Sequence, residues 1–198
     1  MSYPSGRITS TEVPIELTVT DPRGYNVTLG DLRMRHATRV GEVWTWSDWS
    51  RISNAKDDLT YEGKRGFRYQ FKYRAQNELG SWGEFVEFDE DHFVFINNPP
   101  VANGGPAQVT KVGKSVQFSA DASEDRDGDP LEYTWDFGDG TSSSELLPNH
   151  EYEKAGLYTV TLTVSDGYEE SEAYITVYVE EQEQTPGFGP LATMLALL

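Results

Sequence analysis

The sequence predicts an all-β protein built from two tandem β-sandwiches. The chain has 198 residues, enough for two domains of about 100 residues each. Aromatic residues make up 13% of it, and 18 Gly and 10 Pro accompany them, a composition typical of short strands joined by turns. Apolar and polar residues alternate with a period of two in both halves, and no stretch shows helical periodicity.

The alternation places the expected strands. In the first half it predicts strands at 15–19, 44–46 and 67–75, with turn-forming residues between them at 21–24 and 62–64. Clusters of Gly and Asp, which accept tight-turn geometry, separate the expected strands of the second half. Those strands are 116–120, 131–137, 158–164 and 173–179. This spacing is typical of antiparallel sandwiches.

A proline-rich segment divides the chain. Asn97 and Asn98 precede Pro99 and Pro100, and successive prolines donate no ladder hydrogen bonds, so no central strand continues through them. We therefore predict three parts: residues 1–97, 98–181 and 182–198, the last an acidic spacer followed by a disordered or short apolar tail.

Charge is concentrated in the second half. The formal net charge is −17, and residues 98–198 hold 18 acidic side chains but only 4 basic ones. Such a segment repels phosphate backbones and anionic lipids and attracts cations, so we expect no nucleic-acid partner. The longest apolar run, 190–198, is too short to span a bilayer, so membrane attachment is expected only through a C-terminal anchor of a longer protein.

Four motifs of the second half occur in a characteristic order: DGDP at 127–130, WDFGDG at 135–140, PNHEY at 148–152 and GLYTVTLTV at 156–164. Together they closely resemble the PKD (polycystic kidney disease-type) domain over roughly residues 98–180. The resemblance implies an immunoglobulin-like sandwich of cell-surface and secreted proteins that serves as a spacer, adhesion or substrate-contact module and is not itself an enzyme.

The first half resembles a fibronectin type III or related immunoglobulin-like domain through YQFKYRAQNELG at 69–80. Residues 46–50 also spell the tryptophan-serine box of cytokine receptors, but that box follows the corresponding strand there and precedes it here, so we treat the match as coincidence. TPGFG at 185–189, followed by apolar residues, resembles the PGF-type sorting signal of archaeal surface proteins, truncated at its end.

Three aspartates suggest a metal site. Asp125, Asp127 and Asp129 offer the hard oxygen ligands that Ca²⁺ prefers, although the Gly and Glu required by an EF-hand are missing. The PKD resemblance adds an asparagine, Asn97 or Asn98, and we take Asn98, Asp125, Asp127 and Asp129 as the predicted calcium ligands. The alternative is that these aspartates cap turns through side-chain hydrogen bonds.

No catalytic constellation is evident in the sequence. His150 is expected to make a structural hydrogen bond, and Asp136 and Asp139 to form turns. Alternating tryptophans more often fill a core than form a sugar-binding face, so we expect the former for Trp44 and Trp46, and the same holds for Trp49 and Trp82.

These observations predict a non-enzymatic, extracellular adhesion or spacer module of a cell-surface protein, of archaeal type, that contacts surface proteins or polysaccharide. The alternatives are an accessory substrate-binding region of a secreted protease or glycosidase, and a carbohydrate-binding module in the first half.

Overall fold

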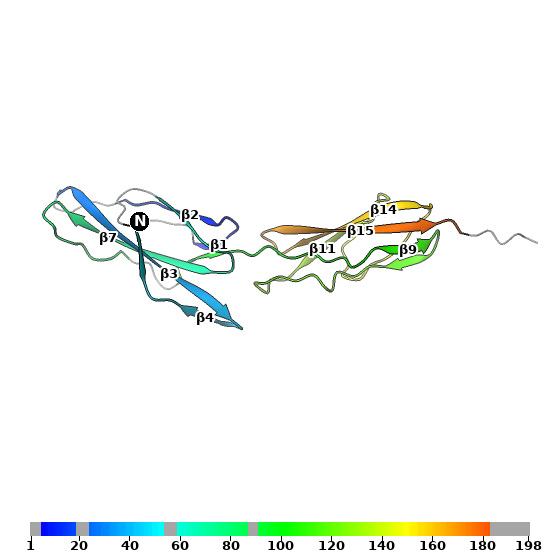
Figure 1. The fold of residues 1–198 in the computed structure, drawn as a ribbon, viewed down its shortest axis with the longest axis horizontal. Coiled ribbons are helices and arrows are strands. Elements are labelled where there is room, and N and C mark those ends of the chain that lie inside the picture. The colour runs from blue at the N-terminus through cyan, green and yellow to red at the C-terminus, as the bar shows by residue number, and fades with distance from the viewer. Residues whose placement is uncertain (1–4, 19–23, 54–58, 87–90, 183–198) are drawn as a thin grey trace, which may run out of the picture. The chain divides into compact units, whose positions relative to one another are not determined.

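The structure, a computed structural model, describes residues 5–18, 24–53, 59–86 and 91–182. It confirms the predicted fold class of two tandem immunoglobulin-like β-sandwiches (Figure 1). Within those ranges every regular element is a strand, and none is a helix able to cross a membrane. The chain forms two compact units: Met1–Val101 with Glu124–Glu132 and Ser165–Ser171, and the remaining segments.

A six-stranded sheet forms most of the first unit, in the order β1-β8-β7-β3-β4 with β5 also paired to β3. Its strands are β1 (Gly6–Ile8), β3 (Val27–Val40), β4 (Val43–Trp46), β5 (Ser50–Ser53), β7 (Arg68–Asn77) and β8 (Val94–Ile96). A two-stranded sheet of β2 (Glu12–Ile15) and β6 (Leu59–Glu62) packs against its inner face through Val13 and Ile15.

The longest pairing in this unit joins β3 and β7 in antiparallel register from Val27 opposite Asn77 to Ala37 opposite Arg68. Because side chains alternate across a strand, Leu32 and Met34 enter the core while the residues between them point to the other face. The partners from β7 on the core side are Tyr69, Phe71 and Tyr73. The sequence analysis did not predict β3, whose apolar positions alternate with arginines.

The strands of the second half form a five-stranded sheet, β12-β11-β14-β15-β9, and a two-stranded sheet of β10 and β13. Their bounds are β9 Gln108–Lys111, β10 Ser115–Gln117, β11 Glu132–Asp136, β12 Ser142–Ser143, β13 Asn149–Glu151, β14 Gly156–Ser165 and β15 Glu170–Glu180. The four strands expected here therefore fall on β10, β11, β14 and β15. Trp135 is fully buried against Phe118, and its Nε1 donates to the carbonyl of Glu145 at 3.0 Å.

Two aspartates shape the turn after β11, as predicted. Oδ1 of Asp136 accepts the N–H of Gly138 at 2.9 Å, and Oδ1 of Asp139 accepts the N–H of Thr141 at 3.0 Å. Gly138 has a φ of 78°, and a Cβ built there would lie 2.5 Å from the carbonyl oxygen of Thr159. This turn therefore requires glycine both for its backbone angle and for its close approach to β14.

Replacing Gly138 with Ala should destabilise the second unit more than replacing Gly140, its neighbour in the same turn. Gly140 also has a positive φ, of 92°, but nothing lies within 4 Å of its added Cβ. Gly140→Ala should cost about 1–2 kcal/mol from backbone strain alone, and Gly138→Ala roughly 1–3 kcal/mol more from the backbone clash. Urea unfolding of both variants tests this, and equal destabilisation would contradict the close approach.

Candidate metal site

The loop that carries the predicted ligands is held by one of them. Oδ1 of Asp125 accepts the N–H of Asp127 at 2.8 Å and the N–H of Asp129 at 3.2 Å. Asp125 thus makes the turn-capping hydrogen bonds that the sequence analysis offered as the alternative to metal binding. Its other oxygen, Oδ2, is buried and has no hydrogen-bond partner within the described ranges.

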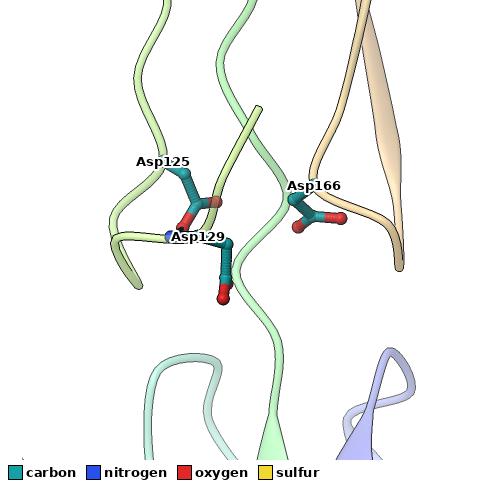
Figure 2. A group of neighbouring side chains, drawn as sticks. All are labelled: Asp125, Asp129 and Asp166. Carbon is teal, nitrogen blue, oxygen red and sulfur yellow. Dashed lines mark hydrogen bonds between the residues drawn. The ribbon is translucent and has the colours of Figure 1, made fainter. Parts of the chain in front are cut away.

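Three carboxylates come together beside this loop (Figure 2). One oxygen each from Asp125, Asp129 and Asp166 lies within 4.8 Å of the others. Asp166 follows β14, is only 6% exposed, and accepts the N–H groups of Tyr168 and Glu169 through Oδ1, both at 2.7 Å. The sequence analysis missed Asp166 because it treated the Asp-Gly pair at 166–167 only as a turn signal.

The other two predicted ligands bind each other. The backbone N–H and Nδ2 of Asn98 donate to the two carboxylate oxygens of Asp127, at 2.8 and 2.7 Å. Asn97, in contrast, is buried and donates to Oδ2 of Asp166 at 2.8 Å. The structure therefore brings Asp125 and Asp129 together with Asp166, and places Asn98 and Asp127 outside that cluster.

Burial and hydrogen bonds move the carboxyl pKa values in opposite directions. Burial raises the pKa of Asp125, aided by the negative charges of Asp127 and Asp129 and opposed by the N–H groups that it accepts. Burial also acts to raise the pKa of Asp166, but the hydrogen bonds from Asn97, Glu169 and Tyr168 outweigh it, so this pKa is lowered. Asp166 is thus held as an anion. It lies beside the carboxyl group of Asp125, whose charged form burial disfavours.

A cation already neighbours the cluster. Within the same unit, Nη1 of Arg7 donates to Oδ2 of Asp129. The three carboxylates of the cluster therefore outnumber the one guanidinium group that contacts them. Oδ2 of Asp125 still has no hydrogen-bond partner within the described residues. Hard carboxylate oxygens with one unsatisfied buried acceptor fit a calcium ion.

A second polar cluster surrounds His150. Its ring stacks on Phe137 with centroids 4.1 Å apart, and its Nε2 lies 2.7 Å from Oδ2 of Asp139. The hydroxyl of Thr141 donates to the same carboxylate at 2.6 Å. Asp139 and His150 border a cavity of about 280 Å³ with Lys154 and Tyr158. His150 therefore makes the structural hydrogen bond expected of it, between the turn after β11 and β13.

The tryptophans of the first half do not fill its core, so that expectation was wrong. Of the chain's five tryptophans, only Trp135 is fully buried. Trp44 and Trp46 are partly buried on the face of the sheet opposite the core, and Trp82 is 37% exposed. Arginine side chains lie over their rings. The period-2 pattern predicted β4 but could not show which face of the sheet was buried.

The fold and motifs define an all-β immunoglobulin-like module, and comparison gives part of it a family. Residues 97–180 match the PKD domain model, which supports a PKD domain in this segment. PKD domains are non-catalytic modules. The crystal structure of the PKD1 domain of Vibrio anguillarum Epp is similar, with 40% identity and a TM-score of 0.37, covering 43% of this chain and 99% of that one.

Longer similarities extend to collagenases. Collagenase ColQ1 of Bacillus cereus is 32% identical over 152 residues, or 73% of this chain. The microbial collagenase of Vibrio alginolyticus is 42% identical over 139 residues, or 64% of this chain. The matched region spans only 16% of the length of each of these relatives.

Proposed function

We propose that this chain is a non-catalytic, extracellular accessory region of a collagenase-type protease, where it acts as a spacer and contacts the insoluble substrate. The observation that carries this proposal is the similarity to two collagenases over 73% and 64% of the chain. These shares exceed what residues 97–180 alone would account for, so the likeness includes more than the PKD domain. The proposal favours the accessory-region alternative of the sequence analysis over a cell-surface protein.

The structure supports a binding rather than a chemical role. Sheets supply most of the described residues, and the clustered polar side chains at Asp125 and at His150 are held by hydrogen bonds that shape loops. The archaeal sorting signal expected at 185–189 lies outside the described residues, so the cell-surface origin stays a prediction. Surface adhesion would use the same spacer properties.

Retention on collagen tests this function. The whole chain should sediment with insoluble collagen fibrils in a saturable, concentration-dependent manner and release no soluble peptides from them. Microcrystalline cellulose and a tube without matrix serve as controls. Equal, low recovery with collagen and with cellulose would contradict a substrate-contact role, and peptide release would contradict a non-catalytic one.

We also propose that Ca²⁺ binds at Asp125, Asp129 and Asp166. The support is the 4.8 Å grouping of their oxygens and the buried, unpartnered Oδ2 of Asp125. A bound ion would link the loop at 125–129 to the turn after β14, two segments that are 37 residues or more apart in sequence. Calcium would thereby stiffen one end of the PKD domain.

Thermal unfolding with and without 10 mM CaCl₂ tests the metal proposal, since a ligand bound only by the folded state raises its stability. With a dissociation constant of about 0.1–1 mM, typical of extracellular sites, the gain is about 1.4–2.7 kcal/mol. Asp166→Asn should abolish the gain. Asp127→Asn, a matched change in a residue directed at Asn98, should retain it.

Two results would overturn this site: no calcium-dependent gain in the unaltered chain, or the same gain in Asp166→Asn. A gain lost only in Asp127→Asn would instead favour the ligand set predicted from sequence.

A further inference from the structure

All the arginine and lysine residues in the six-stranded sheet point away from its core. The six strands contain eight of them: Arg7, Arg33, Arg35, Arg39, Arg51, Arg68, Lys72 and Arg74. The only carboxylate in the same strands is that of Asp31. We call the surface formed by these eight side chains the basic face. It belongs to a chain whose formal net charge is −17.

Strand register places these side chains together. Arg33 lies opposite Lys72, and Ala37 lies opposite both Arg68 and Trp46. Directly opposed residues share a face of the sheet, as do residues two apart along a strand. Since Leu32 and Met34 are in the core, the odd-numbered residues of β3 from Asp31 to Arg39 are on the opposite side. The basic face is therefore a consequence of pairing and alternation.

Aromatic rings separate the cations. The Cζ of Arg35 lies 4.8 and 4.9 Å from the ring centroids of Trp46 and Trp49. The Nζ of Lys72 lies 4.4 Å from Trp49 and 4.6 Å from Phe85. The series continues through Phe85, Arg74 and Trp82. Cation-π contacts of this kind fix the positions of the positive groups and occupy ring faces.

One end of the basic face is partly neutralised by a carboxylate of the same sheet. Asp31 is fully buried and accepts hydrogen bonds from Arg33, Arg51 and Arg74, with the shortest, from Arg51, at 2.9 Å. Burial acts to raise the pKa of Asp31, but these three guanidinium groups outweigh it and hold the pKa well below its usual range. Asp31 is thus ionised, and its single negative charge offsets part of the positive charge of its three neighbours.

The other end has no such carboxylate in its strands. The Cζ of Arg68 lies 4.1 Å from the Trp44 ring, and its Nε is buried with no hydrogen-bond partner within the described ranges. Burial lowers the pKa of Arg68, and the positive charges of Arg39 and Arg7 lower it further. Arg39 is exposed and donates to backbone carbonyls, and Arg35 donates to Oε1 of Gln70. At this end Arg7 pairs with Asp129, whereas the buried Nε of Arg68 leaves donor capacity unused.

We propose that the basic face binds an acidic polysaccharide, with its carboxylate or sulfate groups pairing with the guanidinium groups of Arg35, Arg39 and Arg68. This inference rests on the proposed accessory role and names a second partner class for it. A sheet face presents side chains about 7 Å apart along each strand, an extended array suited to a linear polymer. Guanidinium groups held in place by aromatic rings favour oxyanions through charge-assisted hydrogen bonds.

Two other polyanion-binding modes fit less well. Single-stranded nucleic acid binds through bases that stack on free aromatic faces, whereas Trp49 has cations on its ring. The overall charge of −17 also opposes the dense phosphates of nucleic acid. Protein interfaces centre on aromatic anchors that enter a partner's pockets, and here the rings already pack against the chain's own cations.

Isothermal titration of the whole chain tests the inference, with polygalacturonate and dextran sulfate as ligands and neutral dextran as the control. EDTA is included so that calcium cannot bridge the ligand to the aspartates. We expect at least one polyanion to bind at 50 mM NaCl and to weaken as salt rises. The two ligands distinguish a carboxylate source from a sulfate source.

Variants locate the binding. Arg39→Gln and Arg35→Gln should each weaken binding about tenfold, the value of one charge-assisted hydrogen bond. Lys64→Gln makes the same charge change at an exposed position outside the six-stranded sheet and should leave binding unchanged. Circular dichroism confirms that each variant is folded, and because Arg39 is exposed its replacement is not expected to disturb the core.

Three results would overturn the inference: no binding of either polyanion at 50 mM NaCl, equal binding by Arg39→Gln and by the unaltered chain, or tighter binding of oligodeoxythymidine or polyglutamate than of both polysaccharides. Collagen retention is measured separately. If the chain is retained on collagen but binds neither polysaccharide, only this inference is refuted. If it binds a polysaccharide but is not retained on collagen, only the collagen contact is refuted.

Discussion

The antiparallel pairing of β3 with β7 is the constraint on which the first unit depends. Ten positions pair between Val27 and Ala37 on one strand and Arg68 and Asn77 on the other. A shift of one residue would exchange the two faces of the sheet. Leu32 and Phe71 would then meet solvent, and arginines would enter the core. Burial of the apolar set therefore fixes the register, and the register in turn gathers the cations on one surface.

Asp31 reduces the electrostatic repulsion among the cations of the basic face. Eight cations on adjacent strands repel one another, and a buried carboxylate that three arginines share relieves part of this repulsion. Aromatic rings between the remaining cations add further attraction. The compensation by Asp31 does not reach Arg68, whose pKa is lowered by burial and further by repulsion from Arg39 and Arg7. At this end Asp129 pairs with Arg7, and an anionic partner would pair with Arg39 and Arg68.

In the PKD domain, several aspartates accept hydrogen bonds from backbone N–H groups. Asp136 and Asp139 hold the turn after β11, and one oxygen of Asp125 holds the loop that follows Glu124. The second oxygen of Asp125 accepts no hydrogen bond within the described residues, and the Asp125 carboxylate lies near those of Asp129 and Asp166. Turn capping and metal binding are therefore compatible uses of the same residue. The sequence analysis had treated them as alternatives.

Strands with one clearly apolar face could be predicted from sequence. Those of the second half were, because Val160, Leu162 and Val164 alternate with polar residues and Gly-Asp turns bound them. β3 was missed because its inward positions include Gly30 and His36, which weaken the apolar pattern.

The carboxylate cluster at Asp125, Asp129 and Asp166 was predicted only in part. Asp166 is far from the loop at 125–129 in sequence, and no local pattern reports that long-range approach. The prediction that the tryptophans of the first half fill its core was wrong for a different reason. A period of two shows that Trp44 and Trp46 share a face but leaves open which face is buried. Only the pairing of β4 with β3 decides it.

The central claim is that binding belongs to the outward face of the β3–β7 sheet. Amide hydrogen exchange of the whole chain, with and without saturating polygalacturonate or dextran sulfate, tests it most directly. The account predicts added protection in β3, β4 and β7 and none in β14 or β15. Protection confined to β14 and β15, or none in β3 and β7 when ligand is bound, would contradict it.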